Sequence, residues 1–245
     1  NATFSHINLP DGGVPSMYSD KDPTPPAIWL PQNEVGNSPS ATLLIPEGKP
    51  FAGQVLSADL TQGAIHRVYM QEVDGTWQGA VFRHTMGLEG GPNDIKWGPD
   101  GALYVGAMGS GGSGGWGWGK TLFGLQRLVP TGETAFEYEK IEATKDGFKV
   151  SFTEPVKEGQ LDKIENWKVT AWTYVATPHY GGPKREEHKA NVTGIKVSDD
   201  RKSAELIVDG RRPNYVYHIR IDATSEKGEK MWSPESWVTF HKAPK

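Results

Sequence analysis

Short runs in which apolar and polar residues alternate, separated by turn residues, constrain the fold of this 245-residue chain most. Successive side chains of a strand point to opposite faces, so each run predicts a half-buried β-strand. No segment of useful length carries the 3.6-residue period of an amphipathic helix. The pattern therefore predicts an all-β chain. The expected strands are 51–60, 64–73, 76–85, 94–108, 122–129, 147–156, 166–175, 192–198, 203–210, 215–223 and 235–242.

Composition divides the chain near residue 135. The first 135 residues contain 23 of the 30 glycines and only 7 of the 26 basic residues. We therefore expect two domains, residues 1–135 and residues 136–245. The second region has about seven short strands in roughly 110 residues, with a polar hairpin turn at 198–203, which is typical of an immunoglobulin-like sandwich.

The first region has the strand spacing of β-propeller blades. Asp74-Gly75, between the runs 64–73 and 76–85, and Asp100-Gly101, within the run 94–108, are strong hairpin-turn signals. A blade takes about 40–45 residues and a closed propeller needs at least four blades, so residues 1–135 supply about three at most. Three explanations stay open: a fragment of a longer polypeptide, which we favour, pairing with material outside this chain, or packing of a partial sheet on the sandwich. We expect the proline-rich first 40 residues to form an irregular wrapping segment that covers an open sheet edge.

Several function classes lack support in the sequence. The formal net charge of −4 gives no nucleic-acid footprint, and no apolar run is long enough to span a membrane. The absence of cysteine excludes thiol catalysis, thiolate metal sites and a c-type haem attachment motif within this chain. Neither a Gly-x-Ser-x-Gly elbow nor a P-loop is present.

The run 90–109, GGPNDIKWGPDGALYVGAMG, resembles the inner-strand signature of six-bladed sugar-dehydrogenase-like propellers, the glucose/sorbosone dehydrogenase family. With NSPSATLLIPEG (37–48) and GWGWGKTLFGLQRLVPTG (115–132), the chain is similar over residues 28–241 to the end of large secreted bacterial proteins. In these, a quinoprotein-like propeller is joined to an Ig-like domain and frequently to a cytochrome c module.

The resemblance implies what the whole protein does. It implies oxidation of a sugar hydroxyl with pyrroloquinoline quinone (PQQ) and calcium, in a secreted or periplasmic protein. The implied partners are carbohydrate, a cytochrome c module and the remaining propeller blades. The catalytic base of the family lies in an earlier blade and matches no residue here. The catalytic residues therefore stay unknown, and we expect this chain alone to be catalytically incomplete.

Polar residues at the ends of the expected propeller strands are candidates for binding the quinone. Arg67 and Arg127 offer guanidinium groups for its carboxylates, and His66 suits proton transfer near neutral pH. Arg83 and His84 end the next strand and belong to the same set. Alternation places His66 and Arg67 on opposite faces, and the competing interpretation is that one of the two is an ordinary surface residue.

Hard oxygen ligands for calcium occur together at Glu89, Asn93 and Asp94. Their spacing is not that of an EF-hand, and nearby Asp100 is more simply the turn residue of its hairpin. The remaining histidines considered, His179, His188 and His218, lack metal-ligand spacing.

The segment 108–120, MGSGGSGGWGWGK, lies between two expected strands, so it is interpreted as a native loop rather than an interdomain linker. Trp116 and Trp118 are two residues apart, so in an extended segment they share a face and could stack on sugar rings. The competing interpretation is that both tryptophans close the bottom of a blade as core. An alternative function is therefore a non-catalytic polysaccharide-binding or scaffolding module.

Overall fold

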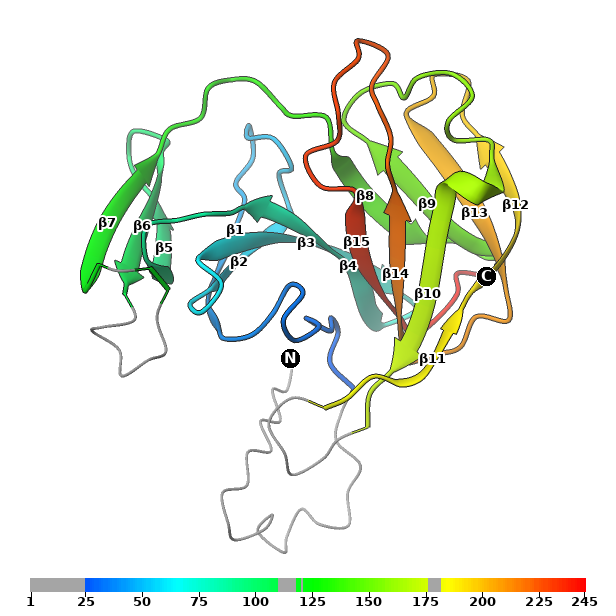
Figure 1. The fold of residues 1–245 in the computed structure, drawn as a ribbon, viewed down its shortest axis with the longest axis horizontal. Coiled ribbons are helices and arrows are strands. Elements are labelled where there is room, and N and C mark those ends of the chain that lie inside the picture. Colours follow the sequence, from blue (N-terminus) through cyan, green and yellow to red (C-terminus); the bar gives the residue numbers. More distant parts are fainter. Residues whose placement is uncertain (1–24, 110–117, 120, 176–181) are drawn as a thin grey trace, which may run out of the picture.

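The structure, a computed structural model, describes residues 25–109, 118–119, 121–175 and 182–245 (Figure 1). Over these residues it contains fifteen β-strands in three antiparallel sheets and a single 3₁₀ turn, η2 (Ile164–Asn166). The prediction of an all-β fold is confirmed.

The largest sheet has eight strands in the order β1-β2-β3-β4-β15-β14-β10-β11. Its first half is an up-and-down meander, and β3 and β4 match the predicted runs 64–73 and 76–85 residue for residue. They meet at Asp74-Gly75, where both residues have positive φ (45° and 79°), as a two-residue type I′ hairpin requires. The bounds are β1 (Pro39–Leu44), β2 (Val55–Asp59), β3 (Ala64–Val73), β4 (Thr76–Thr85), β10 (Trp167–Thr173), β11 (Arg185–Lys189), β14 (Tyr215–Ile221) and β15 (Glu235–Phe240).

A four-stranded sheet in the order β12-β13-β9-β8 packs on one face of β4, β15, β14 and β10. Alternate residues of both sheets fill the core between them, among them Phe148, Leu206, Tyr217 and Phe240. This is the predicted Ig-like sandwich, with the hairpin at 198–203 joining β12 to β13. Its strands are β8 (Tyr138–Ala143), β9 (Gly147–Phe152), β12 (Asn191–Val197) and β13 (Ser203–Asp209).

The third sheet is a three-stranded meander in the order β5-β6-β7. It comprises β5 (Gly91–Trp97), β6 (Leu103–Met108) and β7 (Phe123–Leu128). Its inner face packs on β1, β2 and β3 through Ile95, Leu103 and Val105, which contact Leu56 and Ile65. Two successive meanders therefore stack face to face, as blades of a propeller do.

The two predicted regions share a continuous sheet, because β4 pairs with β15 in an antiparallel register that places Val81 opposite Trp237. The edge of β4 is therefore paired within the chain. Three explanations for a partial propeller were open. The β4–β15 pairing agrees with the third, in which the partial sheet packs on the sandwich, because it joins the two within one sheet.

Residues 25–38 lie across a face of the large sheet, on the side opposite the sandwich (Figure 1). Val35 and Trp29 pack there against Trp172, Trp237 and neighbouring valines of the sheet. The expectation that the proline-rich segment covers a sheet edge is wrong for these residues, because this sheet face is apolar and its burial holds the segment in place. Residues 1–24, also part of that prediction, lie outside the described residues.

Candidate functional site

Arg67 of β3 is the most completely buried charged residue at the junction of the two predicted regions, with no exposed surface. One guanidinium nitrogen, Nη1, donates to Gln54 Oε1 (2.6 Å) and to the Glu139 carbonyl (2.8 Å). The other, Nη2, donates to Glu137 Oε2 (2.8 Å) and to the Tyr138 carbonyl (2.5 Å). Arg67 therefore joins β3 to the start of β8 by direct contacts.

Aromatic rings enclose the same guanidinium. Its carbon lies 3.7 Å from the centre of the Phe51 ring and 4.7 Å from that of Phe82. Burial lowers the pKa of Arg67, and the Glu137 carboxylate opposes that shift. Both Nη atoms are occupied by protein acceptors, so the side chain has a structural role in this fold. The prediction that Arg67 binds the quinone therefore lacks support, because neither Nη group is free to donate to a carboxylate of the quinone.

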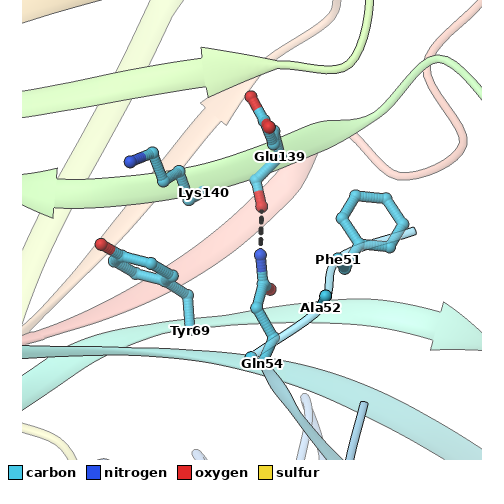
Figure 2. A pocket seen from close by; sticks show the side chains of 7 residues that line it. Phe51, Ala52, Gln54, Tyr69, Glu139 and Lys140 are labelled. Carbon is cyan, nitrogen blue, oxygen red and sulfur yellow. Dashed lines mark hydrogen bonds between the residues drawn. The ribbon is translucent and has the colours of Figure 1, made fainter. Parts of the chain in front are cut away.

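A pocket of about 430 Å³ opens beside this junction, between the loop before β2, strand β3 and strand β8 (Figure 2). Gln54 bridges it, since Gln54 Nε2 donates to the Glu139 carbonyl at 2.9 Å. At its other end Tyr69 donates its hydroxyl to Glu142 (2.9 Å), and burial raises the pKa of Tyr69. Lys140 also pairs with Glu142 at 2.9 Å. The polar groups of Gln54, Tyr69 and Lys140 thus have partners within the protein.

His66 points to the opposite face of β3 from Arg67, as the alternation predicted. Its Nε2 is 3.0 Å from Gln62 Oε1, and its Nδ1 is buried without a hydrogen-bond partner among the described residues. Burial lowers the pKa of His66 to about 4. The expectation that one of His66 and Arg67 is a surface residue is wrong, since both lie in the interior of the molecule, at 1% and 0% exposure.

His84, on β4, lies on the Arg67 side of the sheet. Its ring meets Phe51 edge-on at 6.2 Å, and burial together with the charge of Arg67 lowers its pKa to about 4. Arg83 points to the other side, pairs with Glu235 and lies 4.8 Å from the Trp237 ring. The four basic residues of β3 and β4 are therefore divided between two faces and do not converge on one ligand position.

Arg127 of β7 is far from this junction and forms an exposed ion pair with Asp100, whose Oδ2 lies 2.6 Å from Arg127 Nη2. The Tyr104 hydroxyl donates to the same oxygen at 3.0 Å. Asp100 also accepts from the Ala102 N–H, as expected of the turn residue of this hairpin. The structure does not bring Arg127 together with His66 and Arg67.

The predicted calcium ligands Glu89, Asn93 and Asp94 are all exposed. Asp94 Oδ1 accepts from the N–H of Ile95, its neighbour in the sequence, at 2.9 Å. Within the described ranges, no group of three or more His, Asp or Glu side chains is arranged to hold a metal ion. His188 and His218 do not form such a group, and His179 lies outside the described residues.

Trp118 is anchored at one edge and open at the other. Its Nε1 donates to the Leu88 carbonyl at 3.0 Å, its ring lies against Gly63, and 43% of the residue is exposed. Gly63 has φ of +57°, and a Cβ there would lie 2.2 Å from the indole ring. Trp118 is therefore held in a fixed place without being core. Trp116 lies outside the described residues.

Sequence reasoning missed the acceptors that define the junction. Glu137 follows Arg67 by 70 residues and has no local motif, and Phe51 adopts a positive φ of 63° that its sequence does not signal. Glu34 was also missed: it pairs with Lys184 (2.5 Å) and accepts from Trp237 Nε1 (2.5 Å), which fastens residues 25–38 to the sheet. Such contacts between distant segments leave no trace in a local pattern.

No helix in the part of the chain that the structure describes is long and apolar enough to cross a membrane. Comparison with protein-family profiles, with curated proteins and with solved structures finds no match to this chain.

Proposed function

We propose that this chain is the C-terminal portion of a secreted or periplasmic bacterial quinoprotein of the sugar-dehydrogenase type. Within it, the chain is a structural end piece without catalytic groups of its own. The observation that carries the proposal is the stacking of the β1–β4 meander on the β5–β7 meander, followed directly by the sandwich. A propeller repeats four-stranded antiparallel meanders as blades, and neighbouring blades stack face to face.

The residues considered for quinone binding do not fit a quinone. Arg67 is enclosed by protein acceptors, and His66 is buried on the opposite face of the same strand. Arg127 is engaged by Asp100 at the far end of the molecule. We therefore derive no catalytic step from this chain. In this proposal PQQ and calcium are held by the remaining propeller blades, and a cytochrome c module accepts the electrons.

A non-catalytic carbohydrate-binding module is the second candidate, and Trp118 favours it. Sugar rings stack their C–H faces on aromatic side chains, and a ring held in place loses little freedom on binding. Trp118 is fixed by the Leu88 carbonyl and by Gly63, yet remains 43% exposed. This arrangement suits a platform for a polysaccharide.

Two titrations of the purified chain, followed by tryptophan fluorescence, separate these functions. One uses PQQ with calcium, and the other uses a panel of soluble polysaccharides. The end-piece proposal predicts no saturable response to PQQ and none to the glycans. Saturable glycan binding that is lost in Trp118→Ala and kept in Trp77→Ala would favour the binding module, since Trp77 is similarly exposed on a distant hairpin. Stoichiometric PQQ binding would contradict the assignment of the quinone to other blades.

A further inference from the structure

Strand β7 presents large apolar side chains beside an open sheet edge. Phe123 is 79% exposed and Leu125 is 73% exposed, on the face of the sheet that points away from β1 and β2. Within the described ranges β7 pairs with β6 alone, and it forms the outer boundary of the molecule (Figure 1). An apolar edge strand of this kind is a template for pairing with another strand.

Hydrogen-bonded and non-hydrogen-bonded residue pairs alternate along β6 and β7, and this alternation identifies the backbone groups of β7 that face the open edge. The Gly109 N–H donates to the Leu122 carbonyl at 3.1 Å, so Leu122 belongs to a hydrogen-bonded pair with the β6 side. Such pairs alternate along an antiparallel ladder. The N–H and C=O groups of Phe123, Leu125 and Arg127 therefore point to the open edge. The same three residues carry their side chains on the outer face.

We propose that β7 pairs antiparallel with β7 of a second copy of this chain, with Leu125 at the twofold axis opposite Leu125 of the second copy. The two β5–β7 sheets then form one continuous six-stranded sheet across a symmetric dimer. A twofold axis perpendicular to the sheet keeps the outer face of each copy on the same side. The inference is independent of the proposed function.

The sequence of β7 is complementary to itself in this register. Phe123 lies opposite Arg127 of the second copy on both sides of the axis, where guanidinium and ring can make a cation–π contact. Gly124 of one copy lies opposite Gln126 of the other. Within one copy, no atom lies within 4 Å of the place where a Cβ on Gly124 would stand, so the Gln126 side chain of the second copy has room there. A slip of two residues in either direction removes one of the three edge-facing pairs from the strand. Complementarity of this kind favours a second copy over an unrelated strand.

The oligomeric state of the full chain tests the proposal. Sedimentation velocity over a range of concentrations should show a monomer–dimer equilibrium for the native sequence. Leu125→Lys places two like charges at the axis and should weaken association at least tenfold. Ile164→Lys makes the same change at another exposed apolar residue, in η2 next to β10, and should leave association unchanged. An equimolar mixture of Leu125→Lys and Leu125→Glu should recover the dimer.

Cysteine cross-linking tests the register, and the native chain contains no cysteine that could interfere. Leu125→Cys should give a disulfide-linked dimer under mild oxidation, because directly opposed residues have the Cα separation that a disulfide needs. Leu122→Cys should not, since in this register the two copies of residue 122 lie six residues apart along the strands. A monomer at all concentrations, equal association of Leu125→Lys and the native chain, or equal cross-linking at 122 and 125 would each overturn the proposal.

Discussion

The guanidinium of Arg67 and the carboxylate of Glu137 form a buried ion pair, with 2.8 Å between Nη2 and Oε2 and 0% and 9% of the two side chains exposed. The pair connects β3 of the first region to the residue that precedes β8 of the second. Two carbonyl oxygens and Gln54 also accept from the two Nη atoms, whereas Nε is buried without a hydrogen-bond partner among the described residues. The orientation of the sandwich on the large sheet therefore depends on a charged contact as well as on the apolar core.

Removing one partner of this pair should destabilise the fold strongly. We expect Glu137→Gln to lower the free energy of unfolding by about 3–5 kcal/mol, because it leaves the Arg67 charge buried without compensation. Urea denaturation measures the change. Glu205→Gln breaks the more exposed Lys196–Glu205 pair and should cost less than about 1 kcal/mol.

The double variant Arg67→Met/Glu137→Gln completes the comparison. Because it removes the uncompensated charge, it should be less destabilised than the sum of the two single variants. Strict additivity would show that the ion pair does not couple the two segments.

Buried His66 predicts a loss of stability in mild acid. Burial lowers its pKa from 6.5 to about 4, so below pH 6.5 the unfolded state binds a proton that the folded state excludes. Stability is therefore complete above pH 6.5 and falls as the pH drops towards 4. Linkage gives a loss of about 2 kcal/mol from this residue between pH 7 and pH 5.

The variant His66→Gln should remove that part of the pH dependence, measured as the difference between the free energies of unfolding at pH 7 and pH 5. His84, whose pKa is lowered in the same direction, should keep its own share of the loss in this variant. An unchanged slope in His66→Gln would contradict the buried, neutral state of this imidazole.

The strands that the sequence predicts most closely are β3 and β4, which meet at the Asp74-Gly75 turn signal, and β14, whose polar and apolar residues alternate from Tyr217 to Ile221. Strand β8 was missed because a register shift between Tyr138 and Lys140 puts Tyr138 and Ile141, three residues apart, into the same core. Strand β11 was missed because all five of its residues are exposed, so it has no apolar face. Strand β1 was also missed, because it has a similar register shift near Pro39 and lies next to a proline-rich stretch.

Long-range pairing limits prediction of the junction and the candidate site. The β4–β15 contact joins residues about 155 positions apart, and nothing in either strand specifies the other. Burial of His66 and Arg67 follows from layers packed on both faces of β3, which a single alternating run cannot reveal. Local periodicity thus predicts which residues share a face, and tertiary packing decides whether that face is exposed.

The Glu34 side chain should control how firmly residues 25–38 stay on the sheet. It accepts from Trp237 Nε1 and pairs with Lys184, whose Nζ lies 3.7 Å from the centre of the Trp172 ring. We expect Glu34→Ala to speed amide hydrogen exchange in residues 28–36 at least tenfold, because two charge-assisted contacts are lost. Glu47→Ala, at an exposed site off this segment, should leave that exchange unchanged.

The position of Trp118 should depend on the absence of a side chain at Gly63. Gly63→Ala introduces a Cβ that would meet the indole at 2.2 Å, in addition to the strain of an alanine at a φ of +57°. Gly48→Ala isolates the strain, since Gly48 has a φ of +83° and no atom lies within 4 Å of the place for its Cβ. Both variants should lose about 1 kcal/mol of stability from the backbone. Only Gly63→Ala should displace the indole from the Leu88 carbonyl.

Fluorine NMR of protein labelled with 5-fluorotryptophan measures this displacement, with the Trp118 resonance assigned from its absence in Trp118→Phe. In Gly63→Ala the resonance should move towards that of solvent-exposed fluorotryptophan, while in Gly48→Ala it should stay in place. Identical Trp118 resonances in the two glycine variants would mean that Gly63 does not hold the ring. In that case Trp118 would lack the rigidity that makes it a candidate for sugar stacking.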